Sequence, residues 1–250
     1  MSLQEPIGEE CGVFAIYDPD GEAARATYYG LYALQHRGQE SCGMAINHNR
    51  EIVQFKDMGL VNEVFNEEIL SRLPGTMAVG HVRYSTTGES RRENAQPLVI
   101  RYIKGNLALA HNGNLINSEQ LWKQLSENGA IFQTTTDTEA IAYLIARERL
   151  KAGSVERAVE MTMKNLVGAY SLIVMSAKKL IAVRDPWGFR PLSMGRIGKS
   201  ICFSSETCAF DSLGAEFVRD LKPGEIVIIE DGEVRTIDTY VKPASSHMWI

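Results

Sequence analysis

A cysteine stands eleven residues into the chain, where a short acidic stretch gives way to an apolar one. The first ten residues are MSLQEPIGEE, and Cys11 opens the segment CGVFAIY, which has the composition of a buried strand. An N-terminal thiol can use its own α-amine as a base, because that amine has a pKa of about 7.7–8.0. We therefore interpret residues 1–10 as a propeptide, whose removal after Glu10 would make Cys11 a nucleophile that carries its own base.

The segment ALAHNGNL places Asn112 and Gly113 at the end of an apolar strand. An Asn-Gly pair alone is typical of a tight turn. A side-chain amide beside an exposed glycine N–H is also how an oxyanion hole for acyl transfer is assembled. The segment by itself leaves both interpretations open.

Two charged residues could hold a free amino acid. Arg83 ends an apolar strand in GHVRYSTTGES, and a guanidinium can bind a carboxylate through two parallel hydrogen bonds. Asp137 opens a helix in QTTTDTEAI, where its carboxylate could bind an ammonium group. Each has a simpler explanation: an ion pair with a neighbouring carboxylate for Arg83, and helix-dipole stabilisation of about 0.3–1 kcal/mol for Asp137.

The histidines are alternative bases. None of the five lies in a papain-like local signature. His81 and His111 end apolar strands, and we interpret them as packing residues. If the amine of Cys11 is not the base, then His36, His81 and His111 are the candidates.

These residues need a scaffold, and short β-like runs bounded by Gly, Asp, Asn or Pro supply most of it. Runs such as SLIVM and IVII are continuously apolar, as in strands buried on both faces. Amphipathic helices are expected at 23–34, 62–73, 118–128, 137–150 and 154–166. Asn117 and Ser118 are good N-cap residues for the third of these, and Thr136 with Glu139 forms a capping-box pattern at the fourth. The pattern predicts one domain of packed sheets with helices outside.

Composition excludes several classes of protein. The 250 residues carry a net charge of −5 with no basic run, so nucleic acid is not expected as a partner. No stretch has the roughly 18 apolar residues of a membrane helix, and the N-terminus does not have the pattern of a signal peptide. We therefore expect a cytoplasmic protein without a membrane partner. Cys42 and Cys202 lie in apolar runs and are expected in the core, and no Cys/His cluster has the close spacing of a zinc site, so no metal site is expected.

In their order, the segments ECGVFAIY, LQHRGQES, GHVRYSTTG, NAQPL, LALAHNGNL and TDTEA resemble the N-terminal-nucleophile (Ntn-hydrolase) glutamine amidotransferases. Two later segments, DPWGFRPLSMG and SSETCAFDSLGA, are similar to the amidophosphoribosyltransferase family, which opens purine nucleotide synthesis. The resemblance covers residues 11 to about 237. It implies an α+β fold, a four-layer αββα sandwich of antiparallel sheets.

The resemblance also implies roles for individual residues. Cys11 would attack the side-chain amide of L-glutamine and form a thioester, with the Asn112 amide and the Gly113 N–H as oxyanion donors. Arg83 would hold the substrate carboxylate, and Asp137 the substrate ammonium.

Three further residues match the family with less defined roles. Arg37 and Gly38, in a segment that could equally be a solvated turn, match residues lining the pocket of the nucleophile. Thr86 lies in the stretch 83–89, which matches a loop that closes over glutamine.

The resemblance divides the chain into a propeptide at 1–10, a type-2 glutamine amidotransferase domain at 11–240, and at 241–250 the start of a linker to a phosphoribosyltransferase domain that is absent from this sequence. It implies no cofactor in this chain. Mg²⁺, and in one branch a 4Fe–4S cluster, belong to the full-length relatives, which are expected to be homo-oligomers. The partners expected are L-glutamine and the phosphoribosyltransferase domain. Two alternatives stay open: an amidotransferase that feeds another acceptor, and an inert regulatory module of the same fold.

Overall fold

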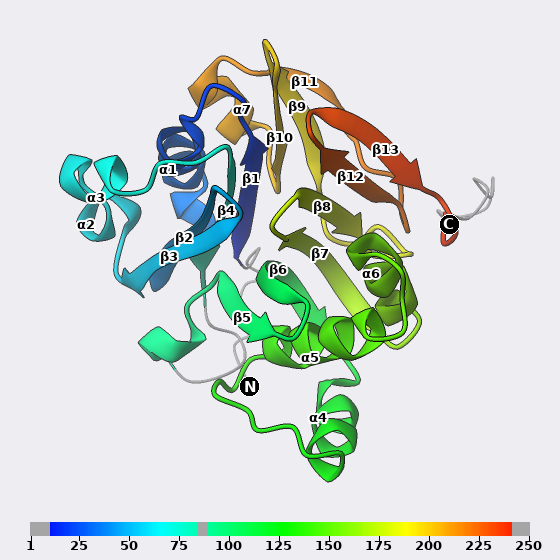
Figure 1. Cartoon of the computed structure of the whole chain (residues 1–250). Coiled ribbons are helices and arrows are strands. Elements are labelled where there is room, and N and C mark those ends of the chain that lie inside the picture. Colours follow the sequence, from blue (N-terminus) through cyan, green and yellow to red (C-terminus); the bar gives the residue numbers. More distant parts are fainter. Residues whose placement is uncertain (1–10, 85–89, 242–250) are drawn as a thin grey trace, which may run out of the picture.

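The strand that follows Cys11, β1 (Gly12–Tyr17), divides its side chains between two apolar layers. Val13 and Ala15 point into the layer between two sheets, while Phe14 and Ile16 point into the layer under a helix. Because side chains alternate along a strand, a continuously apolar strand suits a sheet covered on both faces. The computed structural model describes residues 11–84 and 90–241, and it has this layered arrangement throughout (Figure 1).

The first sheet has seven strands, and its neighbours are antiparallel. Their order across the sheet is β11 (Glu216–Asp220), β9 (Ser193–Ile197), β10 (Ser200–Ser204), β1, β4 (Met77–Arg83), β2 (Ser41–His48) and β3 (Glu51–Met58). β1 is therefore the central strand of the sheet.

The second sheet has six strands and is also antiparallel. Their order is β13 (Glu233–Ile237), β12 (Ile226–Glu230), β8 (Lys179–Arg184), β7 (Gly168–Met175), β6 (Gly105–Leu115) and β5 (Leu98–Tyr102). Along β6, Leu107 and Leu109 face the outer helices, and Ala108 and Ala110 face the first sheet.

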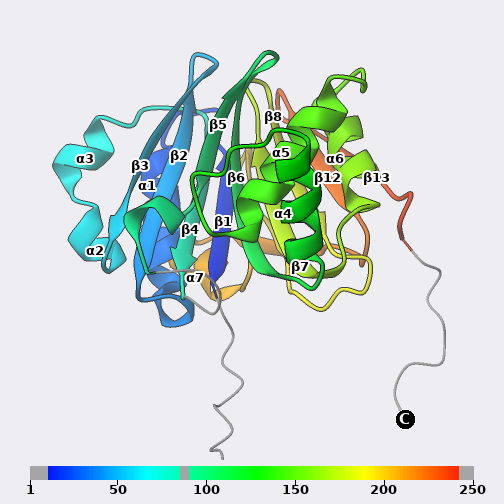
Figure 2. The ribbon, with the colours of Figure 1, turned by 90° about the horizontal axis from the view of Figure 1, so that it is seen from below.

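Helices cover the outer face of each sheet, as Figures 1 and 2 show. The first sheet is covered by α1 (Ala23–Ala33), α2 (Val61–Val64), α3 (Glu67–Ser71) and α7 (Cys208–Leu213). The second is covered by α4 (Ser118–Glu127), α5 (Asp137–Arg149) and α6 (Val155–Met163). The predicted αββα sandwich of antiparallel sheets is confirmed. Among the described helices, none has the length and hydropathy of a membrane span.

The local predictions differ from the structure at several points. The helix predicted at 62–73 is two short helices, because the Asn66 side chain accepts the backbone N–H of Ile69 at 2.9 Å and starts α3 afresh. The capping box at Thr136 does not form; the Glu139 carboxylate instead accepts the backbone N–H groups of Gln133 and Thr134.

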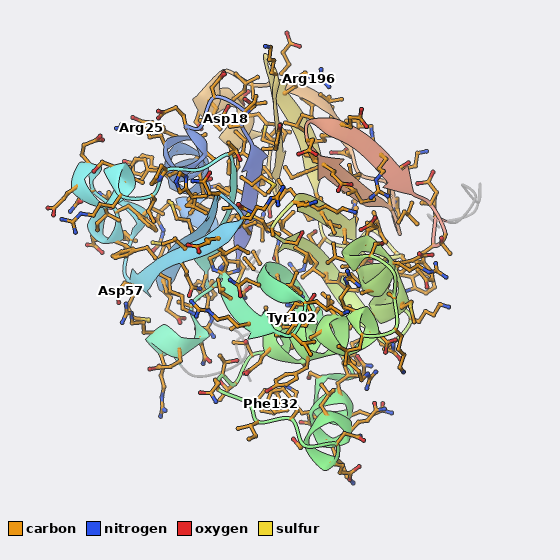
Figure 3. All side chains as sticks on the ribbon, viewed as in Figure 1. Asp18, Arg25, Asp57, Tyr102, Phe132 and Arg196 are labelled. Carbon is orange, nitrogen blue, oxygen red and sulfur yellow. The ribbon has the colours of Figure 1, made fainter. Side chains whose placement is uncertain are left out.

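The predicted cap at α4 is also wrong in detail. Asn117 occupies the N-cap position, but its side-chain oxygen accepts the N–H of Val167 at 3.1 Å and ties the helix to the loop before β7. In the segment between α4 and α5, Phe132 (labelled in Figure 3) stacks on Trp122 of α4 with ring centroids 4.1 Å apart. These contacts fix the position of α4 beside the start of α5.

Candidate active site

Cys11 is held from both sides by the backbone and side chain of Arg37. The Cys11 N–H donates to the Arg37 carbonyl oxygen at 3.2 Å, and Arg37 Nε donates to the Cys11 carbonyl oxygen at 2.7 Å. The Cys11 thiol lies 3.5 Å from the carbonyl oxygen of Tyr84. Cys11 has a φ of +62°, a left-handed conformation that is uncommon outside glycine.

The ends of β1 and β4 bring Cys11 and Arg83 together. Gly12 pairs with Val82 in the antiparallel register, so the preceding Cys11 lies beside Arg83. Gly38 packs against the same backbone, and a Cβ atom there would lie 2.6 Å from the backbone nitrogen of Arg83. The expectation that Arg37 and Gly38 lie beside the cysteine therefore agrees with the geometry, and a solvated turn does not, because Arg37 is 1% exposed.

Arg83 forms an ion pair with a neighbouring carboxylate, which is the simpler of the two roles predicted for it from the sequence. Its guanidinium is almost fully buried and pairs with the carboxylate of Glu40. Glu40 lies two residues after Gly38. The loop whose Arg37 contacts Cys11 therefore also positions the Arg83 guanidinium. A guanidinium has five N–H donors, so one carboxylate does not exhaust its capacity.

Asn112 links the two sheets near the cysteine. Its Nδ2 donates to Ser205 Oγ at 3.3 Å, and the same Oγ accepts the backbone N–H of Val13 at 3.0 Å. The Oδ1 atom is buried and has no hydrogen-bond partner among the described residues. A 180° rotation of the Asn112 side-chain amide would exchange the positions of Oδ1 and Nδ2. The Ser205 hydroxyl could then donate to Oδ1, and Nδ2 would occupy the position where Oδ1 now has no partner. Asn112, which Ser205 links to Val13 two residues after Cys11, could thus present an N–H donor near the cysteine.

Gly113 cannot carry a side chain in its present conformation. Its φ is +143°, and a Cβ atom would lie 2.1 Å from the carbonyl oxygen of Ala169 on the neighbouring strand. Asn112 and Gly113 are within β6 rather than in a turn, so the tight-turn interpretation of Asn-Gly is wrong.

Asp137 stands at the first residue of α5 and contacts β6. Its Oδ1 lies 3.1 Å from His111 Nδ1, and its Oδ2 accepts the Leu115 N–H at 3.0 Å. Burial opposes ionisation of the carboxyl, but the pairing with His111 and the backbone N–H outweighs it, so the pKa of Asp137 is below its ordinary value.

A cavity of about 400 Å³ adjoins this carboxylate. Its walls are formed by polar residues of β6, α4 and the approach to α5, with one aromatic ring: Asn114, Ser118, Glu119, Trp122, Thr135 and Asp137. The negative charge of Asp137 is therefore beside space that a small molecule could occupy.

The three histidines considered as bases have different environments. His81 is fully buried; Nε2 donates to the His111 carbonyl oxygen, and burial lowers the pKa of His81 to about 3, which makes it a poor base at neutral pH. His111 is also buried, and its Nδ1 lies 3.1 Å from Asp137 Oδ1. His36 is mostly exposed and lies beside Glu206, in the segment SSETCAF.

The sequence prediction missed Ser205, Glu40 and Gln96 as supporting residues. Ser205 orients Asn112, Glu40 holds Arg83, and Gln96 Oε1 accepts the His111 N–H at 2.8 Å. All three fall in segments that carry the family resemblance, which was the available signal. Thr86, predicted to bind substrate, lies outside the described residues.

Comparisons with known proteins agree with this geometry. A family model described as a glutamine amidotransferase domain matches residues 81–212. The chain is 51% identical over 225 residues to the amidophosphoribosyltransferase of Methanocaldococcus jannaschii, and 48% identical over 237 residues to that of Archaeoglobus fulgidus. These matches cover 90% and 94% of this chain but 48% and 51% of the relatives. The chain thus spans about half the length of the curated relatives it matches.

A solved structure shows the same arrangement. The glutamine phosphoribosylpyrophosphate (PRPP) amidotransferase from B. subtilis, complexed with ADP and GMP, superposes with a TM-score of 0.84 and 43% identity, covering 91% of this chain and 49% of that one. Two stacked antiparallel sheets between helices, with a cysteine entering the central strand, define the class of N-terminal-nucleophile amidotransferases. The chain belongs to the glutamine amidotransferase domain family.

Proposed function

We propose that this chain releases ammonia from L-glutamine through a thioester on Cys11. In the whole protein, the ammonia would react with phosphoribosyl pyrophosphate to give 5-phosphoribosylamine, the first committed step of de novo purine synthesis. The observation that carries the proposal is the link from Val13, two residues after the cysteine, through Ser205 Oγ to Asn112. Similarity to amidophosphoribosyltransferases supports the choice of acceptor.

In the proposed reaction, residues 1–10 are a propeptide and the α-amine of Cys11 is the base. The amine accepts the thiol proton as Sγ forms a bond to the amide carbon of glutamine. Asn112 and Gly113 donate to the oxyanion of the tetrahedral intermediate. The carbon–nitrogen bond then breaks, and the amine returns the proton to the leaving ammonia. Water, deprotonated by the same amine, hydrolyses the thioester and frees glutamate.

Substrate holding would use the two charged residues of the site. Arg83, positioned by Glu40, would bind the glutamine carboxylate, and Asp137 would bind its ammonium group. Arg37 and Gly38 would shape the pocket around the cysteine, and Thr86 would belong to a loop that closes over the substrate. The site needs no cofactor for this chemistry, because thiol and amine supply both nucleophile and base.

The proposal extends to the whole protein. A phosphoribosyltransferase domain would follow this one through a linker that begins at 241–250, and Mg²⁺ would act in that domain. The cysteines described here do not fit a 4Fe–4S cluster, since Cys42 and Cys202 are fully buried in the apolar layer under α1.

We place the protein in the cytoplasm as a homo-oligomer. Its four cysteines form no disulfide, which supports a reducing compartment.

Active-site labelling tests the nucleophile. The glutamine analogue diazo-oxo-norleucine alkylates thiol nucleophiles and should add to Cys11 alone, as read by peptide mapping. Cys11→Ser and Cys11→Ala should abolish ammonia release while the thermal midpoint stays near that of the wild type. A label on Cys42, Cys202 or Cys208 would contradict the assignment.

Two further measurements separate the parts of the proposal. Protein that retains residues 1–10 should be inactive, and intact mass should show their loss in active protein; full activity with them attached would return His36, His81 and His111 as candidate bases. The 250-residue chain should release ammonia without making phosphoribosylamine, and phosphoribosyl pyrophosphate should not stimulate it. Stimulation would place an acceptor site within these residues.

A further inference from the structure

Three side chains with metal-binding atoms meet at the surface beside the active site. They are His36, in the short helix that follows α1, and Glu206 and Cys208, at the start of α7. The helices α1 and α7 lie side by side in Figures 1 and 2 and bring these residues together, although His36 and Glu206 are 170 residues apart in sequence. This distance is why sequence spacing predicts no metal site.

The ligand atoms already lie at nearly the separations that a metal ion imposes. His36 Nε2 is 3.0 Å from Glu206 Oε2, and Cys208 Sγ is 3.7 Å from the same oxygen. All three atoms lie within 4.8 Å of one another. A tetrahedral zinc ion, with bonds of about 2.0–2.3 Å, would space its ligands about 3.3–3.6 Å apart. Metal binding would require the side chains to rotate until their separations match this range.

The environment of His36 provides an independent indication. Its Nδ1 lies 3.1 Å from the Ala33 carbonyl oxygen, while its Nε2 faces the Glu206 carboxylate. Both ring nitrogens therefore face oxygen acceptors, and a neutral imidazole has only one N–H to give. With the N–H on Nδ1, a cation between Nε2 and the Glu206 carboxylate would satisfy both contacts. Metal-bound histidines commonly donate the other N–H to a backbone carbonyl, as Nδ1 does here.

We propose that His36, Glu206 and Cys208 form a zinc-binding site, with water as the fourth ligand. Nitrogen, carboxylate and thiolate ligands together favour zinc over the harder ions Mg²⁺ and Ca²⁺, which take oxygen ligands. This site does not depend on the proposed glutamine chemistry.

The site is connected to the nucleophile through one carboxylate. Glu206 Oε1 pairs with the Arg37 guanidinium, whose Nε donates to the Cys11 carbonyl oxygen. Zinc would use the other oxygen, Oε2, so both contacts can exist at once. A bound ion would thus fix Glu206 and, through it, the arginine that holds the cysteine.

Cobalt and zinc titrations test the proposal. Metal-free protein, kept reduced with a phosphine, is titrated with Co²⁺, and a thiolate-to-cobalt band in the near ultraviolet with intense visible bands should appear at one ion per chain. Zn²⁺ should then displace the cobalt. His36→Ala and Cys208→Ser should each lower the affinity by more than the roughly 10–100-fold that loss of a supporting partner costs.

Matched controls decide the outcome. His48→Ala removes an exposed imidazole outside the cluster, and Cys11→Ser removes the other partly exposed thiol; both should keep the band. Thermal midpoints without metal should match the wild type, and His36→Gln is the second choice if the alanine variant does not fold. Absence of a thiolate band in the wild type would overturn the proposal. So would a band that survives Cys208→Ser but is lost in Cys11→Ser, since the ion would then bind the nucleophile.

Discussion

The carboxylate of Asp137 lies 3.1 Å from Nδ1 of His111, and this pair joins the start of α5 to β6. Helix-dipole stabilisation alone would need no such partner. The same carboxylate borders the cavity near the candidate active site, so its charge can serve both the fold and a bound ammonium group.

Asp137→Asn should raise the KM for glutamine about 10–100-fold with little change in kcat, because a hydrogen bond between charged groups is lost in substrate binding. Steady-state ammonia release measures both constants. Glu119→Gln, an exposed change in the wall of the same cavity, is the control and should alter neither. If Asp137→Asn lowers the thermal midpoint but leaves KM unchanged, the residue serves only the fold.

Asn112→Ala should lower kcat about 10²–10³-fold with little effect on KM, which is the usual cost of one oxyanion donor. Ser205→Ala should cause a smaller loss of kcat, since Ser205 acts by orienting the Asn112 amide. Asn106→Ala, at the far end of β6, should leave both constants unchanged. A rise in KM without a fall in kcat at Asn112 would assign it to ground-state binding instead.

Arg83→Lys should raise KM about 10–100-fold, because an ammonium cannot form two parallel hydrogen bonds with a carboxylate. The thermal midpoint should change little, since lysine can still pair with Glu40. Glu40→Gln separates the two roles of the ion pair: it leaves a buried guanidinium without its carboxylate and should lower both stability and affinity. An Arg83→Lys enzyme with wild-type KM would mean that the ion pair with Glu40 is the whole role of Arg83.

Glu156 gives a pH dependence of stability. Burial raises its pKa, but hydrogen bonds from Arg235 and Lys179 outweigh this and lower the pKa from 4.5 to about 2. A carboxyl with a depressed folded pKa stabilises the protein above its unfolded pKa and loses that contribution as pH falls. The difference in free energy of unfolding between wild type and Glu156→Gln should therefore be constant above pH 4.5 and shrink toward pH 2. Urea titrations at several pH values measure it, with exposed Glu233→Gln as a flat control.

Gly30 of α1 packs directly on the ring of Phe14. An added Cβ atom would lie 2.6 Å from Phe14 Cδ2, so Gly30→Ala should lower the free energy of unfolding by about 1–3 kcal/mol. Gly153 has no atom within 4 Å of the same added group and no left-handed φ. Gly153→Ala should leave stability unchanged or raise it by about 0.4–1 kcal/mol. Urea unfolding distinguishes the two, and equal effects would mean that α1 shifts to make room.

The sequence pattern predicts most of the fold, because alternating and continuously apolar strands are strong local signals. It misses β11 (Glu216–Asp220), which is mostly exposed and lacks an apolar face, and α7, which has too few residues to show a period. It also predicts caps by residue type alone, whereas the Asn117 side chain and Glu139 bond to other backbone groups.

The candidate site, like the fold, can be predicted from the sequence only in part. Cys11, Arg83, Asn112 and Asp137 can be singled out from residue type and local context, and the structure places each at a strand end or helix start, or within β6 near the cysteine. Ser205 and Glu206 cannot, since their roles arise from contacts with residues about 90 to 190 positions away. Such pairings follow from the register of the sheets and not from any local pattern.

Arg37 holds the backbone of Cys11 on both sides, and β1 pairing begins at the next residue. The contacts described for this cysteine therefore come from parts of the chain made after it during synthesis. If residues 1–10 are a propeptide, as proposed above, the domain could fold and position Cys11 before the bond after Glu10 is cut. Under that order the newly exposed amine would appear already in place, and no unfolded intermediate would carry a reactive N-terminal thiol in the cell.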